Sequence, residues 1–391
     1  MVNYNIDLEG KTVLVTGAAG FIGSNLVKRL FHDVQNIRVV GIDSITDYYD
    51  VNIKYERLKT LSDSPLKGEG RNQKWIFIQG DIADKALVDK VFDEYNPNVV
   101  VNLAAQAGVR YSITNPDAYI QSNLIGFYNI LEACRHHLPT PKEKQQSSVS
   151  SSTIEQDLNA TSPFKGDRGG LEHLVYASSS SVYGSNKKVP YSTDDKVDNP
   201  VSLYAATKKS NELMAHAYSK LYNIPSTGLR FFTVYGPAGR PDMAYFGFTN
   251  KLVKGETIKI FNYGNCKRDF TFVDDIVEGV VRIMQHAPEK QNGEDCLPIP
   301  PYKVYNIGNN SPENLLDFVT ILQEELVRAG VLPKDYDFEA HKELVPMQPG
   351  DVPVTYADTT PLEQDFGFKP NTSLREGLRR FAEWYARYYN D

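Results

Sequence analysis

A tyrosine and a lysine four residues apart, Tyr204 and Lys208, are the residues best placed for acid–base chemistry in this chain. They lie in the helix-like segment VSLYAATKK, in which positions i and i+4 share one face. A neighbouring ammonium favours the phenolate and lowers the pKa of a tyrosine. We therefore expect Tyr204 to act as a general base, with Lys208 keeping it ionisable.

The spacing alone is not specific, because Tyr-x-x-x-Lys occurs four times in the chain. The copies at Tyr183 and Tyr263 each contain a glycine turn, and the copy at Tyr55 follows a different strand. The Tyr204 copy follows an apolar segment that ends in a run of serines at 178–181. The choice of Tyr204 therefore depends on what the rest of the chain places near it.

A glycine-rich turn near the N-terminus has the form that a dinucleotide pyrophosphate requires. An apolar segment runs directly into Gly17, Gly20 and Gly23, and a helical pattern follows. These glycines permit a tight turn, close backbone approach and close helix packing, while the helix N-terminus faces the phosphates. Asp43 ends the next strand, twenty residues after Gly23. We expect it to bind the adenine ribose and repel a 2′-phosphate, which favours NAD over NADP.

The elements that must position these residues alternate between apolar strands and helices. Strands are expected at residues 12–16, 38–43, 75–79, 99–103, 172–178 and 226–232, and long helices at 117–137 and 201–222. Nearly continuous apolar strands separated by helices indicate an α/β fold with a doubly wound parallel (Rossmann) sheet. Ligands of such sheets lie over the carboxyl ends of the strands, which brings the serine run and Tyr204 to the cofactor.

The chain is expected to form two lobes. Residues 1–233 would be the NAD-binding domain, interrupted by a polar insertion at 139–170. Residues 234–268 and 300–391 would form a smaller mixed α/β substrate-binding lobe, and 269–299 would return to the first domain. The insertion is rich in Ser, Gln, Pro and Gly, so it is expected to be a mobile surface segment. A role as a partner-binding loop is the alternative.

Composition argues against several classes of function. A net charge of −7 over 391 residues argues against a nucleic-acid-binding or anionic-membrane surface. The 3 cysteines are far apart and the 7 histidines show no ligand spacing, so no disulfide framework or metal site is expected. The N-terminus lacks a signal-like segment and no apolar run approaches a membrane span. A cytoplasmic location is therefore expected.

Taken together, the motifs resemble the extended short-chain dehydrogenase/reductase family and, within it, the NAD-dependent nucleotide-sugar epimerases. The resemblance covers nearly the whole chain except 139–170. Among the segments that carry it are TGAAGFIG (16–23), YASSSSVYG (176–184), YAATK (204–208) and RDFTFVDDI (268–276). AAQAGVRYS and TVYGPAGRPDMA are more similar to UDP-glucuronate than to UDP-glucose 4-epimerases. Ala238 is a departure, since many such enzymes carry Trp there.

The resemblance implies a role for each matching position. Ser179 would assist Tyr204 at the sugar 4-hydroxyl, and Asn123 would support Lys208. NAD would be bound by Gly17, Gly20, Phe21, Ile22, Gly23, Asp43, Asp81, Ile82, Ala104, Ala105, Asn123 and Lys208. The UDP-sugar would be bound by Arg110, Ser180, Ser181, Thr233, Arg240, Arg268 and Asp351.

Local alternatives stay open at several of these positions. Asp81 could serve only as a turn or helix cap, and Arg268 could pair with Asp269. Serines at strand ends often satisfy backbone groups instead of ligands. Either Arg110 or Arg240 could bind phosphate instead of a sugar carboxylate.

The implied reaction is a 4-epimerisation through a transient 4-keto sugar, with NAD as a resident catalyst. Ser181 occupies a position where family dehydratases and decarboxylases carry an acid, which favours epimerisation. The expected substrate is UDP-glucuronate. UDP-glucose or UDP-N-acetylglucosamine is the alternative, followed by a catalytically silent NAD-binding protein. Helices 117–137 and 201–222 resemble the family's dimer interface, so a homodimer is expected.

Overall fold

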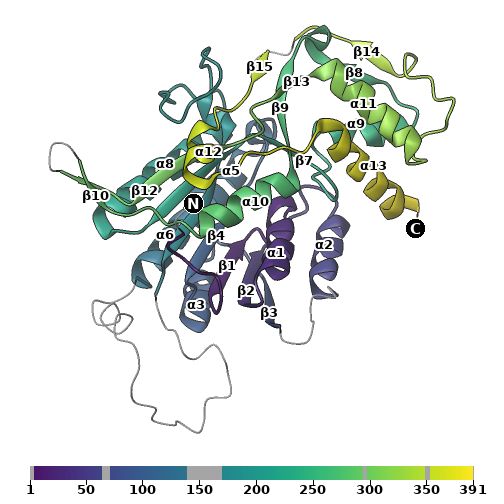
Figure 1. Cartoon of the computed structure of the whole chain (residues 1–391). Helices are drawn as coiled ribbons and strands as arrows, with labels where there is room; N and C mark the ends of the chain where they lie inside the picture. The colour runs from purple at the N-terminus through teal and green to yellow at the C-terminus, as the bar shows by residue number, and fades with distance from the viewer. Residues whose placement is uncertain (1–3, 64–70, 139–169, 294–296, 348–352, 391) are drawn as a thin grey trace, which may run out of the picture.

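A seven-stranded parallel sheet is the centre of the computed structural model, which describes residues 4–63, 71–138, 170–293, 297–347 and 353–390. The spatial strand order is β12–β6–β5–β4–β1–β2–β3 (Figure 1). The strands are β1 (Thr12–Thr16), β2 (Asn36–Asp43), β3 (Asn72–Gln79), β4 (Val99–Asn102), β5 (His173–Ser179), β6 (Ser226–Phe231) and β12 (Tyr302–Ile307). The order reverses on either side of β1, so the predicted doubly wound fold is confirmed.

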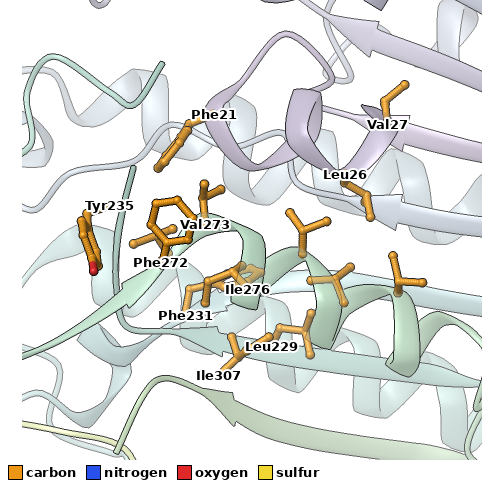
Figure 2. Close-up of a cluster of buried hydrophobic side chains, with 14 of the residues drawn as sticks. Phe21, Leu26, Val27, Leu229, Phe231, Tyr235, Phe272, Val273, Ile276 and Ile307 are labelled. Atoms are coloured by element: carbon orange, nitrogen blue, oxygen red, sulfur yellow. The ribbon is translucent and has the colours of Figure 1, made fainter. Parts of the chain in front are cut away.

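Helices cover both faces of this sheet. One face carries α1 (Phe21–Asp33) and α10 (Val273–Met284), and the other carries α3 (Lys85–Tyr95), α6 (Gly126–His136) and α8 (Leu203–Tyr222). Val13 and Val15 of β1 pack into the first core, whereas Leu14 packs into the second. Figure 2 shows the first core, where Phe21 and Leu26 of α1 lie near Val273 and Ile276 of α10.

Shorter helices surround the carboxyl edge of the sheet. α2 (Asn52–Ser62) follows β2, and η2 (Ser180–Tyr183) is a 3₁₀ turn directly after β5. The single helix expected at 117–137 is instead composed of α5 (Pro116–Tyr119), a π-helical turn η1 (Ile120–Ile125) and α6, preceded by α4 (Tyr111–Thr114). A π turn inserts extra residues into the helical register, and the apolar spacing of the sequence does not reveal that insertion.

The smaller lobe is built on a second, four-stranded sheet. It contains β7 (Thr233–Tyr235), β9 (Lys267–Phe272), β13 (Pro312–Asn314) and β15 (Val354–Thr355). The strand pair β8 (Ile258–Ile260) with β14 (Lys342–Leu344) accompanies it, whereas the pair β10 (Gln291–Asn292) with β11 (Pro298–Ile299) lies near β12 of the main sheet (Figure 1). Its helices are α9 (Ala244–Val253), α11 (Leu315–Arg328) and α13 (Leu374–Asn390), whereas α12 (Thr360–Phe366) packs on β12 of the main sheet. Figure 1 shows α9, α11 and α13 gathered at the end of the molecule remote from α3 and α6.

The expected domain boundaries need two corrections. Strand β12 falls within 300–391, the range assigned to the smaller lobe, yet it pairs with β6 in the main sheet. Strand β9 opens the stretch expected to return to the first domain, yet it pairs with β7, β13 and β15. Pairing partners depend on the folded backbone and not on local composition, so the sequence pattern could not assign them. The insertion at 139–170 lies, apart from Gly170, outside the described residues, and its character stays a prediction.

Within the described ranges, no helix is both long and apolar enough to cross a membrane. The same ranges hold no group of three or more His, Cys, Asp or Glu side chains that could bind a metal ion. Cys134 and Cys266 are buried free thiols.

Candidate active site

A cavity of about 950 Å³ lies where the carboxyl edge of the main sheet meets the smaller lobe. Ligands of doubly wound sheets bind at this edge. The walls come from the glycine turn, the ends of β2, β4 and β5, the start of α8 and the loop after β7. The predicted site residues that line it are Gly17, Gly20, Phe21, Ile22, Gly23, Asp43, Asp81, Ile82, Ala104, Ala105, Arg110, Ser179, Ser180, Ser181, Tyr204, Lys208, Thr233 and Arg240.

Two predicted site residues lie outside the cavity lining, and a third is not described by the structure. Asn123 is buried behind the cavity wall. Arg268 lies on β9, where its Nη1 donates to the carbonyls of Lys267 and Pro353 at 3.1 and 3.2 Å. Asp351 is outside the described residues. The diphosphate and ribose roles of Arg268 and Asp351 therefore stay predictions.

Asp269 serves the architecture of the smaller lobe. It is 1% exposed, and its carboxylate accepts hydrogen bonds from the backbone N–H groups of Asn309, Asn310 and Ala357. These bonds join β9 to the segments that follow β12 and β15. Burial raises the pKa of Asp269 above its usual value and outweighs the same bonds, which lower that pKa.

The glycine turn has the shape that a pyrophosphate needs. Gly17 has φ of +71°, and a Cβ there would lie 2.8 Å from the Ala104 nitrogen. A Cβ at Gly23 would lie 2.2 Å from the Gly17 carbonyl oxygen, so only glycine lets α1 begin this close to the turn. Because α1 starts at Phe21 beside the cavity, its unpaired N–H groups provide an anion-binding site there. The turn therefore fits a dinucleotide.

Asp43 ends β2 next to this turn and is 8% exposed. Its Oδ2 accepts a hydrogen bond from the Ala19 nitrogen at 3.0 Å, and its Oδ1 accepts one from Ile45 at 2.9 Å. Each carboxylate oxygen keeps a second lone pair, so ribose hydroxyls can still bind. Asp81 accepts from the Ala83 nitrogen at 2.8 Å, so it shapes its own turn while also lining the cavity.

The candidate catalytic set is Tyr204, Ser179 and Lys208. Tyr204 lies in the first turn of α8 and is hydrogen-bonded to the side chain of Ser179 at the end of β5. The Ser179 hydroxyl also accepts from the Ser181 nitrogen at 3.1 Å, which fixes its orientation. One helical turn after Tyr204, the Lys208 ammonium donates to the Ala177 carbonyl at 3.0 Å. The three side chains therefore meet on one wall of the cavity.

Burial controls the ionisation of this set. It raises the pKa of Tyr204; the Ser179 hydrogen bond and the charge of Arg240 lower that pKa, and Asp242 raises it. Burial also lowers the pKa of Lys208 to about 8. Desolvation disfavours both charged forms, and the expectation that Lys208 keeps the pKa of Tyr204 low stays a prediction.

A buried ion pair supports the catalytic wall from behind. Glu212, one helical turn after Lys208, accepts from Arg230 Nε and Nη2 at 2.8 and 2.9 Å. It also accepts from the Ser178 hydroxyl at 2.7 Å. Since Arg230 belongs to β6 and Ser178 to β5, the pair fixes α8 against both strands.

The π-helical turn η1 places Asn123 between two parts of the site. Its side chain accepts from the Gln106 nitrogen at 2.8 Å and donates to the Gln106 carbonyl at 3.0 Å. It also donates to the Thr207 hydroxyl at 3.0 Å. Asn123 therefore binds Thr207, the residue before Lys208, and fixes the loop after β4; its expected support of Lys208 stays a prediction.

Sequence reasoning missed several cavity residues, among them Tyr48, Tyr49, Lys54 and Asp242. Asp242 accepts from Arg240 Nε and Nη2 at 3.0 and 2.5 Å, and from the Tyr48 hydroxyl at 3.2 Å. Burial and Asp242 raise the pKa of Tyr48 to about 12. The acid two residues after Arg240 in GRPDMA was the available signal for this pair.

The fold and the cavity define an enzyme of the dinucleotide-binding α/β class, with a Ser–Tyr–Lys set facing the cofactor turn. Residues 13–308 match the NAD dependent epimerase/dehydratase family, and the chain belongs to this family. NAD is accordingly its cofactor, and the glycine turn and Asp43 are the features that fit it.

Relatives and solved structures are similar over nearly the whole chain. Protein CapI of Staphylococcus aureus is 47% identical, covering 96% of this chain and 99% of its own length. UDP-glucuronate 4-epimerase 4 of Arabidopsis thaliana is 41% identical, covering 98% of this chain and 77% of the relative. UDP-glucuronic acid 4-epimerase from Bacillus cereus, solved with UDP-glucuronic acid and NAD, is 28% identical with a TM-score of 0.73; 97% of this chain and 100% of that one are covered.

Proposed function

We propose that the protein interconverts UDP-glucuronate and UDP-galacturonate as an NAD-dependent UDP-glucuronate 4-epimerase. The observation that carries this proposal is the cavity in which Tyr204, hydrogen-bonded to Ser179, lies beside the glycine turn with Arg240 nearby. The relatives that bear this activity in their names support the choice of sugar.

In the proposed mechanism, the Tyr204 phenolate takes the proton of the sugar 4-hydroxyl, and Ser179 holds that hydroxyl by a hydrogen bond. NAD, which the glycine turn and Asp43 would hold, would supply a reversible acceptor for the C4 hydride. Lys208 keeps its ammonium at the cofactor side of Tyr204 and orients the bound ribose. After the 4-keto sugar has rotated in the cavity, Tyr204 would return the proton to the C4 oxygen as the hydride returns to the opposite face of C4. The proton and hydride are both restored, so the reaction is an isomerisation.

Cations and neutral donors would hold the rest of the substrate. The sugar carboxylate is assigned to Arg240 with Ser180, Ser181 and Thr233, which all line the cavity. Arg110, exposed at the cavity wall, is assigned to the same end of the substrate. A β-keto acid loses carbon dioxide readily, so the substrate carboxylate must be restrained while the 4-keto group is present, and these hydroxyl groups and the two arginines would supply that restraint.

The test is a panel of UDP-sugars incubated with purified protein and no added NAD, followed by chromatography of the sugars. UDP-galacturonate should form from UDP-glucuronate. Tyr204→Phe should lower the rate by about 10³-fold or more, because it removes the base, while the NAD released on denaturation stays unchanged. Turnover retained by this variant would disprove the assignment of the base.

A UDP-glucose or UDP-N-acetylglucosamine 4-epimerase is the second candidate. The observation that favours it is the ion pair between Arg240 and Asp242, which already neutralises the cation assigned to the carboxylate. Faster conversion of the neutral UDP-sugars in the same panel would select this reading.

We also propose that the protein is a homodimer. Exposed apolar side chains on α4, η1, α6 and α8 support this proposal, because such side chains on neighbouring helices mark association surfaces. The expected cytoplasmic location is a separate prediction, which cell fractionation would test.

A further inference from the structure

Arg57 of α2 is a buried cation, 4% exposed, that binds backbone carbonyls from two distant segments. Its Nε and Nη2 donate to the Ala238 carbonyl at 3.0 and 2.7 Å, and Nη2 also donates to Gly239 at 3.0 Å. On the other side, Nη1 donates to the Ala19 carbonyl and to the Tyr49 hydroxyl, both at 2.9 Å. The planar fork of a guanidinium makes this set of bonds possible, and a lysine cannot reproduce it.

The two segments held by Arg57 belong to different parts of the site. Ala19 is inside the glycine turn that receives the cofactor pyrophosphate. Ala238 and Gly239 directly precede Arg240, the cation assigned to the sugar carboxylate. One side chain therefore fixes the distance between the cofactor turn and the loop that carries Arg240.

The loop before Arg240 has a constrained shape that needs such support. Ala238 has φ of +51°, a conformation that costs a non-glycine residue energy. A Cβ at Gly239 would lie 1.7 Å from the Tyr245 hydroxyl, so the loop is packed tightly on the side of α9 as well. This loop conformation turns the two carbonyls toward Arg57. The charge-assisted hydrogen bonds that they accept from Arg57 stabilise the loop conformation.

We propose that Arg57 is a positioning residue of the reaction, which acts by holding Arg240 at its place relative to the bound cofactor. The proposal rests on the proposed function, in which Arg240 binds the substrate. Arg57 is not among the residues that line the cavity, so we assign its influence on the substrate to the loop at 238–240, whose carbonyls it binds.

A double-mutant cycle in the NAD-loaded protein tests this role. Arg57→Lys keeps the charge and loses the fork, and it is combined with Arg240→Ala. The readouts are kcat/KM for the UDP-sugar that the wild type converts best and the calorimetric Kd of UDP-glucuronate. We expect Arg57→Lys to lower kcat/KM about ten-fold or more, mainly through KM, in the wild-type background. In the Arg240→Ala background its effect should fall below about three-fold.

Two controls separate positioning from general damage. Arg282→Lys removes a similar fork, with which Arg282 binds Glu278 in the same helix and the Phe366 carbonyl of α12, and it should act equally in both backgrounds. The NAD released on denaturation should change less than two-fold in Arg57→Lys. Equal effects of Arg57→Lys with and without Arg240 would overturn the proposal. Absence of UDP-glucuronate turnover in the wild type would overturn the proposed function instead. The double-mutant cycle could still be measured in that case, from kcat/KM for the UDP-sugar that is converted or from the Kd of UDP-glucuronate.

Discussion

The carboxylate of Asp43 has a structural and a recognition role at the same time. Its two oxygens receive backbone N–H groups from Ala19 and Ile45, which fixes the glycine turn to the loop after β2. The remaining lone pairs are available to the hydroxyl groups of the adenine ribose. A phosphate at the ribose 2′ position would instead lie next to the negative charge of Asp43. Because this site is largely buried, the repulsion between the two charges would be strong.

Replacing Asp43 by Ala should therefore relax the preference of the protein for NAD over NADP. The expected change is a fall of about ten-fold or more in the ratio of the two affinities, since both a repulsion and a hydrogen-bond acceptor are lost. Reconstitution of cofactor-stripped protein with each dinucleotide measures it. Asp47→Ala, a neighbouring exposed acid outside the cavity, is the matched control. An unchanged ratio in the Asp43 variant would contradict the ribose role.

Part of the site was predictable at the scale of residues because its chemistry is local in the sequence. Tyr204, Lys208 and the glycines lie at the ends of regular elements, and their spacing together with the order of those elements predicts their use. Asp242 and Arg57 were missed because their positions depend on segments far away in the chain. Arg57, for example, binds a carbonyl 181 residues later, and no local pattern encodes that contact.

At the scale of elements, the catalytic wall depends on how firmly α8 is held against β5 and β6. The ion pair between Glu212 and Arg230 provides that hold, with both side chains almost completely buried. A buried ion pair is costly to break on one side only, because the other charge then remains without compensation. Loss of this ion pair should therefore disturb the relative positions of Ser179 and Tyr204.

Glu212→Gln should destabilise the protein and slow the reaction together. Loss of the carboxylate leaves Arg230 buried beside a neutral amide, at a cost of about 3 kcal/mol. The expected result is a Tm lower by about 5 °C, measured by scanning calorimetry, and a reduced kcat with the NAD content retained. Glu376→Gln, which breaks surface pairs on α13, is the control and should hardly change the Tm. A Glu212 variant with normal Tm and kcat would contradict the supporting role.

The order of strands and helices was largely predictable, since buried parallel strands and amphipathic helices have strong local patterns. The π turn at η1 and the pairing of β9 and β12 were not. Each of these features is decided by tertiary contacts, such as the hydrogen bonds of Asn123 to Gln106 and Thr207. The apolar spacing of 117–137 is equally compatible with one uninterrupted helix.

At the scale of the whole molecule, the outer surface of the helix layer is unusually apolar. Ile113 is 77% exposed, Leu213 is 59% exposed and Leu221 is 70% exposed. Ile120, Ile125 and Tyr128 add to this surface from η1 and α6. Burial of these side chains against a second copy is the structural basis of the proposed homodimer.

Leu213→Glu should convert the homodimer into a monomer, because it would place two carboxylates in an apolar interface. Light scattering at micromolar concentration measures the mass. Val253→Glu changes an apolar residue of similar exposure in the smaller lobe and should leave the dimer intact. A monomeric wild type, or a Leu213→Glu variant that stays dimeric, would refute this interface.

The buried ammonium of Lys208 has a consequence for the proton balance of unfolding. Its pKa is lowered from 10.5 to about 8 by burial, so between these two pH values the unfolded chain holds a proton there that the folded chain has released. Unfolding then takes up a proton, and the contribution of this site to stability increases as the pH rises from 8 to 10.5. Lys208→Met should therefore be more heat-stable than the wild type near pH 7, with a Tm difference that shrinks toward pH 10. A Tm difference that stays constant with pH would contradict this linkage. A Tm difference that shrinks with rising pH means that the protein keeps a destabilising charge at neutral pH because turnover requires it.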